Sequence, residues 1–172
     1  MKKVFSFVLL GLAVLCFAAC EPGTPPVPPP APDLAEFYIE YEDESGNVVT
    51  LNDGDSVSVT ITEINEMTDQ MTFDGRIIKA SEGDFEIWVD VNRETVDGTM
   101  DELCLSQCVP GNGQAFQMFS DVITEDVTPF YAHITPEDFK TYVIHYWFRE
   151  AGVGVAGIHI TVFYNVEAAL ED

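Results

Sequence analysis

The sequence predicts an all-β domain, an antiparallel β-sandwich of about seven to nine strands over residues 34–168. From Leu34 onward apolar residues recur with period two, in segments rich in Val, Ile, Thr and aromatic residues. Clusters of Gly, Asn and Asp punctuate these segments at intervals of about 8–12 residues, as turns do in β-sandwiches. No internal repeat is evident, so a solenoid is not expected.

The strands are predicted in chain order from these alternating segments. They cover residues 37–41, 47–51, 57–61, 71–73, 76–78, 85–92, 116–118, 130–134, 141–149 and 158–166. Residues 43–46 and 52–55 supply the first two turns. Residues 135–139 predict one short helical turn, because Pro136 suits a first helical position.

The last two predicted strands form the clearest hairpin. If its turn is centred on Gly152, His145 lies opposite His159. One face of the pair is predicted to pack in the core; it carries Tyr142, Ile144, Tyr146, Phe148, Ile160, Val162 and Tyr164. The other face carries Val143, His145 and Trp147.

An export signal precedes the domain. Lys2 and Lys3 begin it, and the apolar residues 4–17 are too few to form a stable membrane span. Phe17, Ala18, Ala19 and Cys20 resemble the lipobox of bacterial lipoproteins, with Phe17 where Leu is usual. The resemblance implies cleavage after residue 19 and lipidation of Cys20. Several acyl chains would hold the protein durably on a membrane, here expected to be the outer membrane of a cell envelope.

Two alternatives to the lipidated cysteine remain at this point. The first is an ordinary secretory signal in which Cys20 is incidental, and the second is a signal anchor that is retained. Residues 20–33 follow as a linker that contains seven of the ten prolines, and proline favours an extended polyproline-II spacer. A ligand for a proline-recognising module is the alternative. Residues 169–172 form a short acidic tail.

The charge of the expected mature chain excludes one class of partner. All 30 acidic residues but only five of the seven basic residues follow the signal, which gives a formal charge of −25. Such a surface repels phosphates, so nucleic acid is not expected as a partner. A solvated acidic surface is the simplest interpretation, and a saline habitat would produce the same bias.

Two cysteines remain for the folded domain once Cys16 and Cys20 are assigned to the signal and the lipid. Cys104 and Cys108 are predicted to form a disulfide, because thiols of exported proteins tend to oxidise. Their spacing is one residue longer than the redox Cys-x-x-Cys spacing, and the neighbouring acids Asp101 and Glu102 would raise a thiol pKa. Zinc is not expected, because the mature chain has no further cysteine.

Several other groups are candidate binding sites. The oxygen-rich turns at residues 43–47, 52–55 and 82–84 suit calcium or, more simply, tight turns. His145 and His159 could hold a metal ion or respond to pH, or form an incidental pair. Trp88 and Trp147 could form an exposed recognition patch or cap the core. Nucleophile and phosphate-binding motifs are absent, so neither an enzyme nor a cofactor is expected.

Four segments resemble immunoglobulin-like sandwich modules of exported Bacteroidetes proteins: residues 88–93, 104–110, 130 with 141–148, and 158–164. The resemblance implies an immunoglobulin-like sandwich with an adhesive or structural role and no catalytic residues. The expected function is therefore that of a lipid-anchored envelope protein with a non-catalytic binding domain. Its partner is expected to be another envelope protein or a glycan. The alternative is a carbohydrate-binding or enzyme-accessory module at the cell surface.

Overall fold

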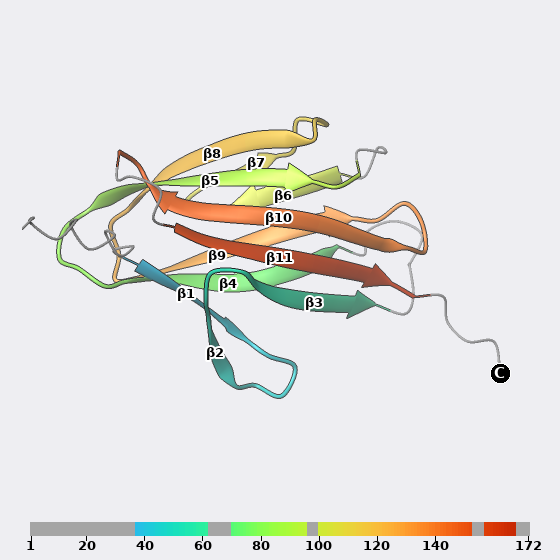
Figure 1. Cartoon of the computed structure of the whole chain (residues 1–172), viewed down its shortest axis with the longest axis horizontal. Coiled ribbons are helices and arrows are strands. Elements are labelled where there is room, and N and C mark those ends of the chain that lie inside the picture. The colour runs from blue at the N-terminus through green and yellow to red at the C-terminus, as the bar shows by residue number, and fades with distance from the viewer. Residues whose placement is uncertain (1–36, 62–69, 96–99, 153–156, 168–172) are drawn as a thin grey trace, which may run out of the picture. The chain divides into compact units, whose positions relative to one another are not determined.

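The computed structural model describes residues 37–61, 70–95, 100–152 and 157–167 (Figure 1). These residues form eleven strands: β1 (Phe37–Glu42), β2 (Val48–Leu51), β3 (Asp55–Ile61), β4 (Met71–Lys79), β5 (Phe85–Arg93), β6 (Met100–Cys104), β7 (Cys108–Pro110), β8 (Phe116–Ile123), β9 (Val127–Thr135), β10 (Thr141–Glu150) and β11 (Gly157–Val166). The predicted all-β sandwich is confirmed. No helix in the described ranges is long and apolar enough to cross a membrane.

The strands form two sheets. The six-stranded sheet has the order β2-β1-β4-β9-β6-β7, and the five-stranded sheet has the order β3-β11-β10-β5-β8. The inner order β1-β4-β9-β6 matches strands A-B-E-D of an immunoglobulin-type sandwich, and β11-β10-β5 matches G-F-C. Two expectations need correction: the described residues form eleven strands and not seven to nine, and the sandwich is not wholly antiparallel, because β3 pairs with β11 in parallel.

A single apolar core lies between the sheets, because alternate side chains of nearly every strand point inward. Phe130 of β9 meets Phe148 of β10 across the interface, with ring centres 5.0 Å apart. The Tyr164 hydroxyl, also in the core, donates a hydrogen bond to the Ala132 carbonyl at 3.0 Å. The predicted core face of the last hairpin is buried as expected.

Strand β4 joins the two short strands that were predicted at residues 71–73 and 76–78. Gly75 continues the ladder opposite Phe130, whose ring occupies the space of the missing side chain. A Cβ at Gly75 would lie 2.4 Å from the Phe130 ring. The glycine therefore permits close packing instead of breaking the strand.

The connection from β9 to β10 forms bends and not the predicted helical turn at residues 135–139. The Tyr142 hydroxyl accepts hydrogen bonds from the amides of Glu137 at 3.0 Å and Asp138 at 2.9 Å. The Tyr142 side chain therefore supplies the hydrogen-bond acceptor for two backbone amides of this connection. A tyrosine corner of this kind occurs at the start of strand F in immunoglobulin-like sandwiches, which is the position of β10.

The register of the β10–β11 hairpin differs from the prediction by two residues. Trp147 lies opposite His159, and His145 lies opposite Thr161, so the two histidines are not partners. The last pair is Arg149 with Gly157, which centres the connection one residue beyond Gly152. Moving the centre by one residue changes each partner by two positions, so the inward and outward faces stay as predicted.

Candidate functional site

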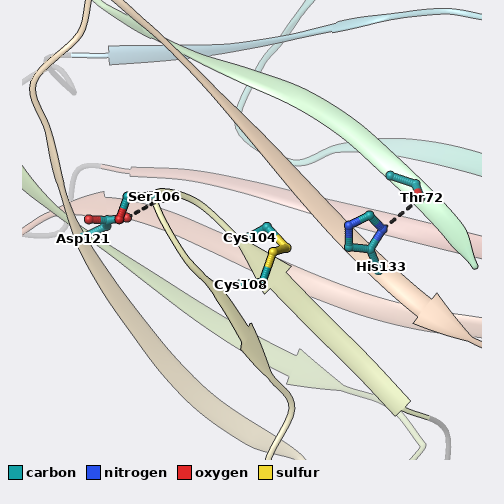
Figure 2. Close-up of a disulfide and its surroundings, with 6 residues drawn as sticks. All are labelled: Thr72, Cys104, Ser106, Cys108, Asp121 and His133. Atoms are coloured by element: carbon teal, nitrogen blue, oxygen red, sulfur yellow. Dashed lines mark hydrogen bonds between the residues drawn. A yellow bond between two sulfur atoms is a disulfide. The ribbon is translucent and has the colours of Figure 1, made fainter.

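The predicted disulfide between Cys104 and Cys108 is present (Figure 2). The two cysteines lie directly opposite each other, Cys104 at the end of β6 and Cys108 at the start of β7. No strand was predicted at residues 100–110. The bond instead closes a short hairpin at the edge of the six-stranded sheet.

The turn of this hairpin is tied to the opposite sheet. The Ser106 amide donates a hydrogen bond of 2.7 Å to the Asp121 carboxylate on β8 (Figure 2). Burial acts to raise the pKa of Asp121, but hydrogen bonds from Ser106 and from the Val122 amide outweigh it and lower the pKa below its ordinary value. The ionised carboxylate therefore holds the hairpin against β8.

A groove of about 370 Å³ lies between the hairpin and β8. We call it the edge groove. It is lined by Leu103, Leu105, Ser106, Gln107, Val109, Met118, Phe119, Ser120 and Asp121. Both of its walls are edge strands, since β7 ends one sheet and β8 ends the other. The groove therefore opens at the sheet edges, where edge strands present backbone N–H and C=O groups that take no part in the hydrogen bonding of their own sheet.

Apolar side chains extend from the edge groove onto the outer face of β8. Phe116 is 58% exposed, Met118 50% and Val122 54%. These three residues point to the same side, because Phe116, Met118 and Val122 are separated by even numbers of positions along one strand. Exposed apolar residues gathered on an edge strand are unusual in a protein this acidic.

Two residues with potential metal ligands, Glu102 and His133, lie beside the disulfide. Glu102 of β6 is directly opposite His133 of β9, and ligand atoms of Glu102, Cys104 and His133 lie within 4.8 Å of one another. His133 Nδ1 is 2.8 Å from the Thr72 hydroxyl (Figure 2). The pairing of β6 with β9, which a linear sequence does not reveal, brings these groups together.

Trp88 and Trp147 lie half-buried on the outer face of the five-stranded sheet. The Arg149 guanidinium is 4.6 Å from the ring centre of Trp88 and 4.9 Å from that of Trp147. The same guanidinium bonds the Asp90 carboxylate at 3.0 Å. The tryptophans therefore share a face, but Arg149 packs on ring surface that a sugar would need.

The two histidines of the predicted pair each have other partners. His145 lies between the Thr161 hydroxyl and the Glu94 carboxylate, both at 3.0 Å. His159 stacks on Trp147 at 4.8 Å and bonds Asp53 at 2.8 Å. Neither histidine lies opposite the other, so the predicted cross-strand pairing of His145 with His159 is wrong.

The order of Thr161, His145 and Glu94 resembles that of a nucleophile, a base and an acid. Thr161 lies in the middle of β11, however, with β10 on one side and β3 on the other. The backbone amides around its hydroxyl are committed to these ladders and do not form an oxyanion hole. The geometry is that of a hydrogen-bonded sheet surface.

The acidic turns are held by their own carboxylates. Asp43 accepts hydrogen bonds from the amides of Asn47 at 2.8 Å and Ser45 at 2.9 Å. The bonds from Asn47, followed by that from Ser45, lower the pKa of Asp43. Asp55 accepts a bond from the Asn52 amide at 2.7 Å. These contacts are those of turn chemistry, which was the simpler of the two interpretations.

The predicted lipidation site, Cys20, lies outside the described residues, as do the signal at 1–19, the linker at 20–33 and the acidic tail at 169–172. These assignments stay predictions from the sequence. The described site is therefore confined to the folded domain.

No protein-family model and no curated protein matches the chain. Among solved structures, the chain is similar to one described as the structure of the N-terminal domain of PorA, with a TM-score of 0.54 and 17% identical residues. The similarity covers 74% of this chain and 96% of that domain. At this level of identity it concerns the fold alone, and it supports the β-sandwich architecture over nearly the full length of that domain.

Proposed function

We propose that this chain is a lipid-anchored protein of a bacterial cell envelope whose β-sandwich binds a partner protein along β8 and the edge groove. The observation that carries the proposal is the exposed apolar row of Phe116, Met118 and Val122 on an edge strand. Edge strands of soluble proteins are normally protected against association by charges, prolines or bulges. The outward positions of β8 hold no charged residue and no proline, and, among the contacts described, the one charged contact with the row is that of the Arg149 guanidinium with the Met118 sulfur at 3.9 Å.

The length and pairing of β8 suit the addition of another strand. Its pairing with β5 is continuous from Phe116 opposite Asn92 to Ile123 opposite Phe85. The strand therefore presents backbone donors and acceptors on its free side, except at Val122, whose amide donates to the Asp121 carboxylate at 2.8 Å. A partner that adds an extended segment gains main-chain hydrogen bonds, and the apolar row supplies side-chain contacts.

Two observations favour binding of a protein over the alternatives. The contacts of Arg149 with both tryptophans count against an open sugar platform. The ladder on both sides of Thr161 counts against acyl transfer at His145. The carbohydrate-binding module and the enzyme are therefore less well supported than a protein-binding module.

The anchor is the second part of the proposal. Lipidation of Cys20 would place the domain at the membrane, with the proline-rich residues 20–33 as a spacer. Cys20→Ser is expected to abolish incorporation of radiolabelled palmitate and to release the protein from the membrane fraction. Retention of the label in this variant would contradict the lipoprotein assignment.

Photo-crosslinking in intact cells tests the partner surface with a matched pair of phenylalanines. Phe116 on β8 is 58% exposed, and Phe139 in the β9–β10 connection is 57% exposed. Benzoyl-phenylalanine at position 116 is expected to give a discrete crosslinked protein, and at position 139 to give none. Equal crosslinking at both positions, or none at position 116, would contradict binding along β8.

A further inference from the structure

The surroundings of the disulfide contain more than a covalent link. Four side chains with metal-binding atoms converge on the outer face of the six-stranded sheet. Cys104 and Cys108 lie opposite each other across β6 and β7, and Glu102 lies two residues before Cys104 and opposite His133. The ligand atoms of Glu102, Cys104 and His133 are within 4.8 Å of one another, and the Cys108 sulfur is bonded to that of Cys104.

We propose that the reduced form of this disulfide is a zinc site, with Cys104, Cys108, His133 and Glu102 as its ligands. Two thiolates, an imidazole and a carboxylate are the ligand types that Zn²⁺ takes in tetrahedral sites. Thiolate sulfur also favours zinc over the hard cations magnesium and calcium. Zinc was not expected from the number of cysteines alone, but the strand pairing supplies the nitrogen and oxygen ligands.

The orientation of His133 supports this assignment. One ring nitrogen, Nδ1, is 2.8 Å from the Thr72 hydroxyl, and the other nitrogen faces the disulfide (Figure 2). A histidine that binds a metal through one nitrogen usually makes a hydrogen bond through the other, which fixes the tautomer and the ring orientation. The stacking of Tyr131 on His133, with ring centres 6.0 Å apart, also holds the ring in place.

The step that opens the site requires a dithiol or phosphine reductant. Two electrons from the reductant break the S–S bond, and each sulfur takes up one proton. When Zn²⁺ binds, the two thiols release these protons to solvent and both sulfurs coordinate the metal as thiolates. Cys104 is buried, but Cys108 is exposed, so a reductant can reach the bond from the Cys108 side.

Zinc binding and reduction would consequently depend on each other. A metal that binds only the dithiol form shifts the equilibrium between dithiol and disulfide toward the dithiol. The hairpin would then keep its closure in both states, through a covalent bond when oxidised and through a shared metal ion when reduced. The site would thus respond to redox conditions and to zinc together.

Cobalt spectroscopy tests the proposal, because Co²⁺ bound to thiolate shows a charge-transfer absorption band. The experiment uses the full chain with the substitutions Cys16→Ser and Cys20→Ser, so that its only thiols after reduction are those of Cys104 and Cys108. After reduction with a phosphine, one equivalent of Co²⁺ is expected to produce the band, and Zn²⁺ is expected to displace it. The oxidised chain is expected to show no band.

Matched histidine variants separate a built site from binding by thiols alone. His133→Ala is expected to weaken zinc binding by more than about 100-fold, and Thr72→Ala by about 10-fold. His145→Ala changes a histidine on the other sheet and is expected to leave binding unchanged. The proposal is overturned if the reduced chain gives no band, or if His133→Ala binds zinc as tightly as His145→Ala. The second outcome is also expected if reduction unfolds the hairpin, because the thiols of an unfolded hairpin would bind zinc without a contribution from His133.

Discussion

The Arg93 guanidinium forms a two-point ion pair with the Asp101 carboxylate between the two sheets. Nε lies 2.8 Å from one carboxylate oxygen and a terminal nitrogen lies 2.5 Å from the other. The side chains are only 5% and 8% exposed. Arg93 belongs to β5 and Asp101 to β6, so the pair joins one sheet to the other. Arg93 also donates to the Gln114 carbonyl and the Gln117 amide oxygen.

Removing one member of this pair is expected to destabilise the domain strongly. Arg93→Met leaves the Asp101 carboxylate buried without its partner, and such changes cost about 3–5 kcal/mol. Urea unfolding measures the loss. The double variant Arg93→Met with Asp101→Leu is expected to cost less than the two single changes combined, because no unpaired charge remains. A single-variant cost below about 1 kcal/mol would show that water reaches the pair.

The absence of a side chain at Gly111 is expected to be required for the ion pair between Arg93 and Asp101. Its amide donates to the Asp101 carbonyl at 2.7 Å, and an added Cβ would lie 2.2 Å from the Asp101 carboxylate. Gly111→Ala should therefore displace Asp101 and cost about 1–3 kcal/mol, as overpacking does. Combining it with Asp101→Asn in a double-mutant cycle should give a total smaller than the sum. If the losses of stability from the two changes simply add, the strain introduced by Gly111→Ala does not act through Asp101.

The disulfide is expected to contribute modestly to global stability. The ring is small, so the chain-entropy model gives about 2 kcal/mol for its loss. Replacing Cys104 and Cys108 together by Ser should lower the free energy of unfolding by about this amount in urea titrations. Replacing only one should give the same result within error, because either change removes the bond. A loss above about 5 kcal/mol would mean that the hairpin supports the whole fold.

The sequence predicted the parts of the fold that depend on local alternation. The inward faces of β5, β10 and β11 follow directly from period-two patterns, since burial of alternate side chains determines them. The disulfide followed from two cysteines in an exported chain. These predictions required no knowledge of which strands are neighbours.

The remaining features depend on pairing between distant segments. Glu102 and His133 are 31 positions apart and meet because β6 pairs with β9. The parallel pairing of β3 with β11 and the edge position of β8 are likewise properties of strand order. The histidine register was wrong because the length of a connecting turn is not fixed by alternation. Arg149 was not recognised as the residue that joins Trp88 to Trp147.

The contact between Ser106 and Asp121 is expected to give the domain a pH dependence in the acidic range. The pKa of Asp121 is lower in the folded state than its ordinary value of 3.8. A group with a depressed folded pKa stabilises the fold above its unfolded pKa, and this contribution disappears as the pH falls through the folded pKa. When the pH is lowered from 6 to roughly 3, the free energy of unfolding of the Asp121→Asn variant should therefore fall by less than that of the unmodified chain.

Urea unfolding at a series of pH values measures this difference. Asp43→Asn provides a comparison, because the pKa of Asp43 is also lowered but its partners belong to the first turn. Both variants should flatten the acidic limb of the stability profile, while only Asp121→Asn should loosen the hairpin, seen as faster hydrogen exchange at the Ser106 amide. An unchanged exchange rate at Ser106 would argue against the carboxylate as its main restraint.

The tyrosine corner offers a test of how the β9–β10 connection is held. Tyr142→Phe removes the oxygen that accepts the amides of Glu137 and Asp138, while its ring, 3% exposed, stays in the core. The part-buried amides then lack their acceptor, so the variant should lose about 1–3 kcal/mol in urea unfolding. Tyr38→Phe is the control, since Tyr38 is 38% exposed on β1, and it should change stability by less than about 0.5 kcal/mol. Equal effects of the two changes would mean that water replaces the hydroxyl at the corner, and that the ring alone positions the connection.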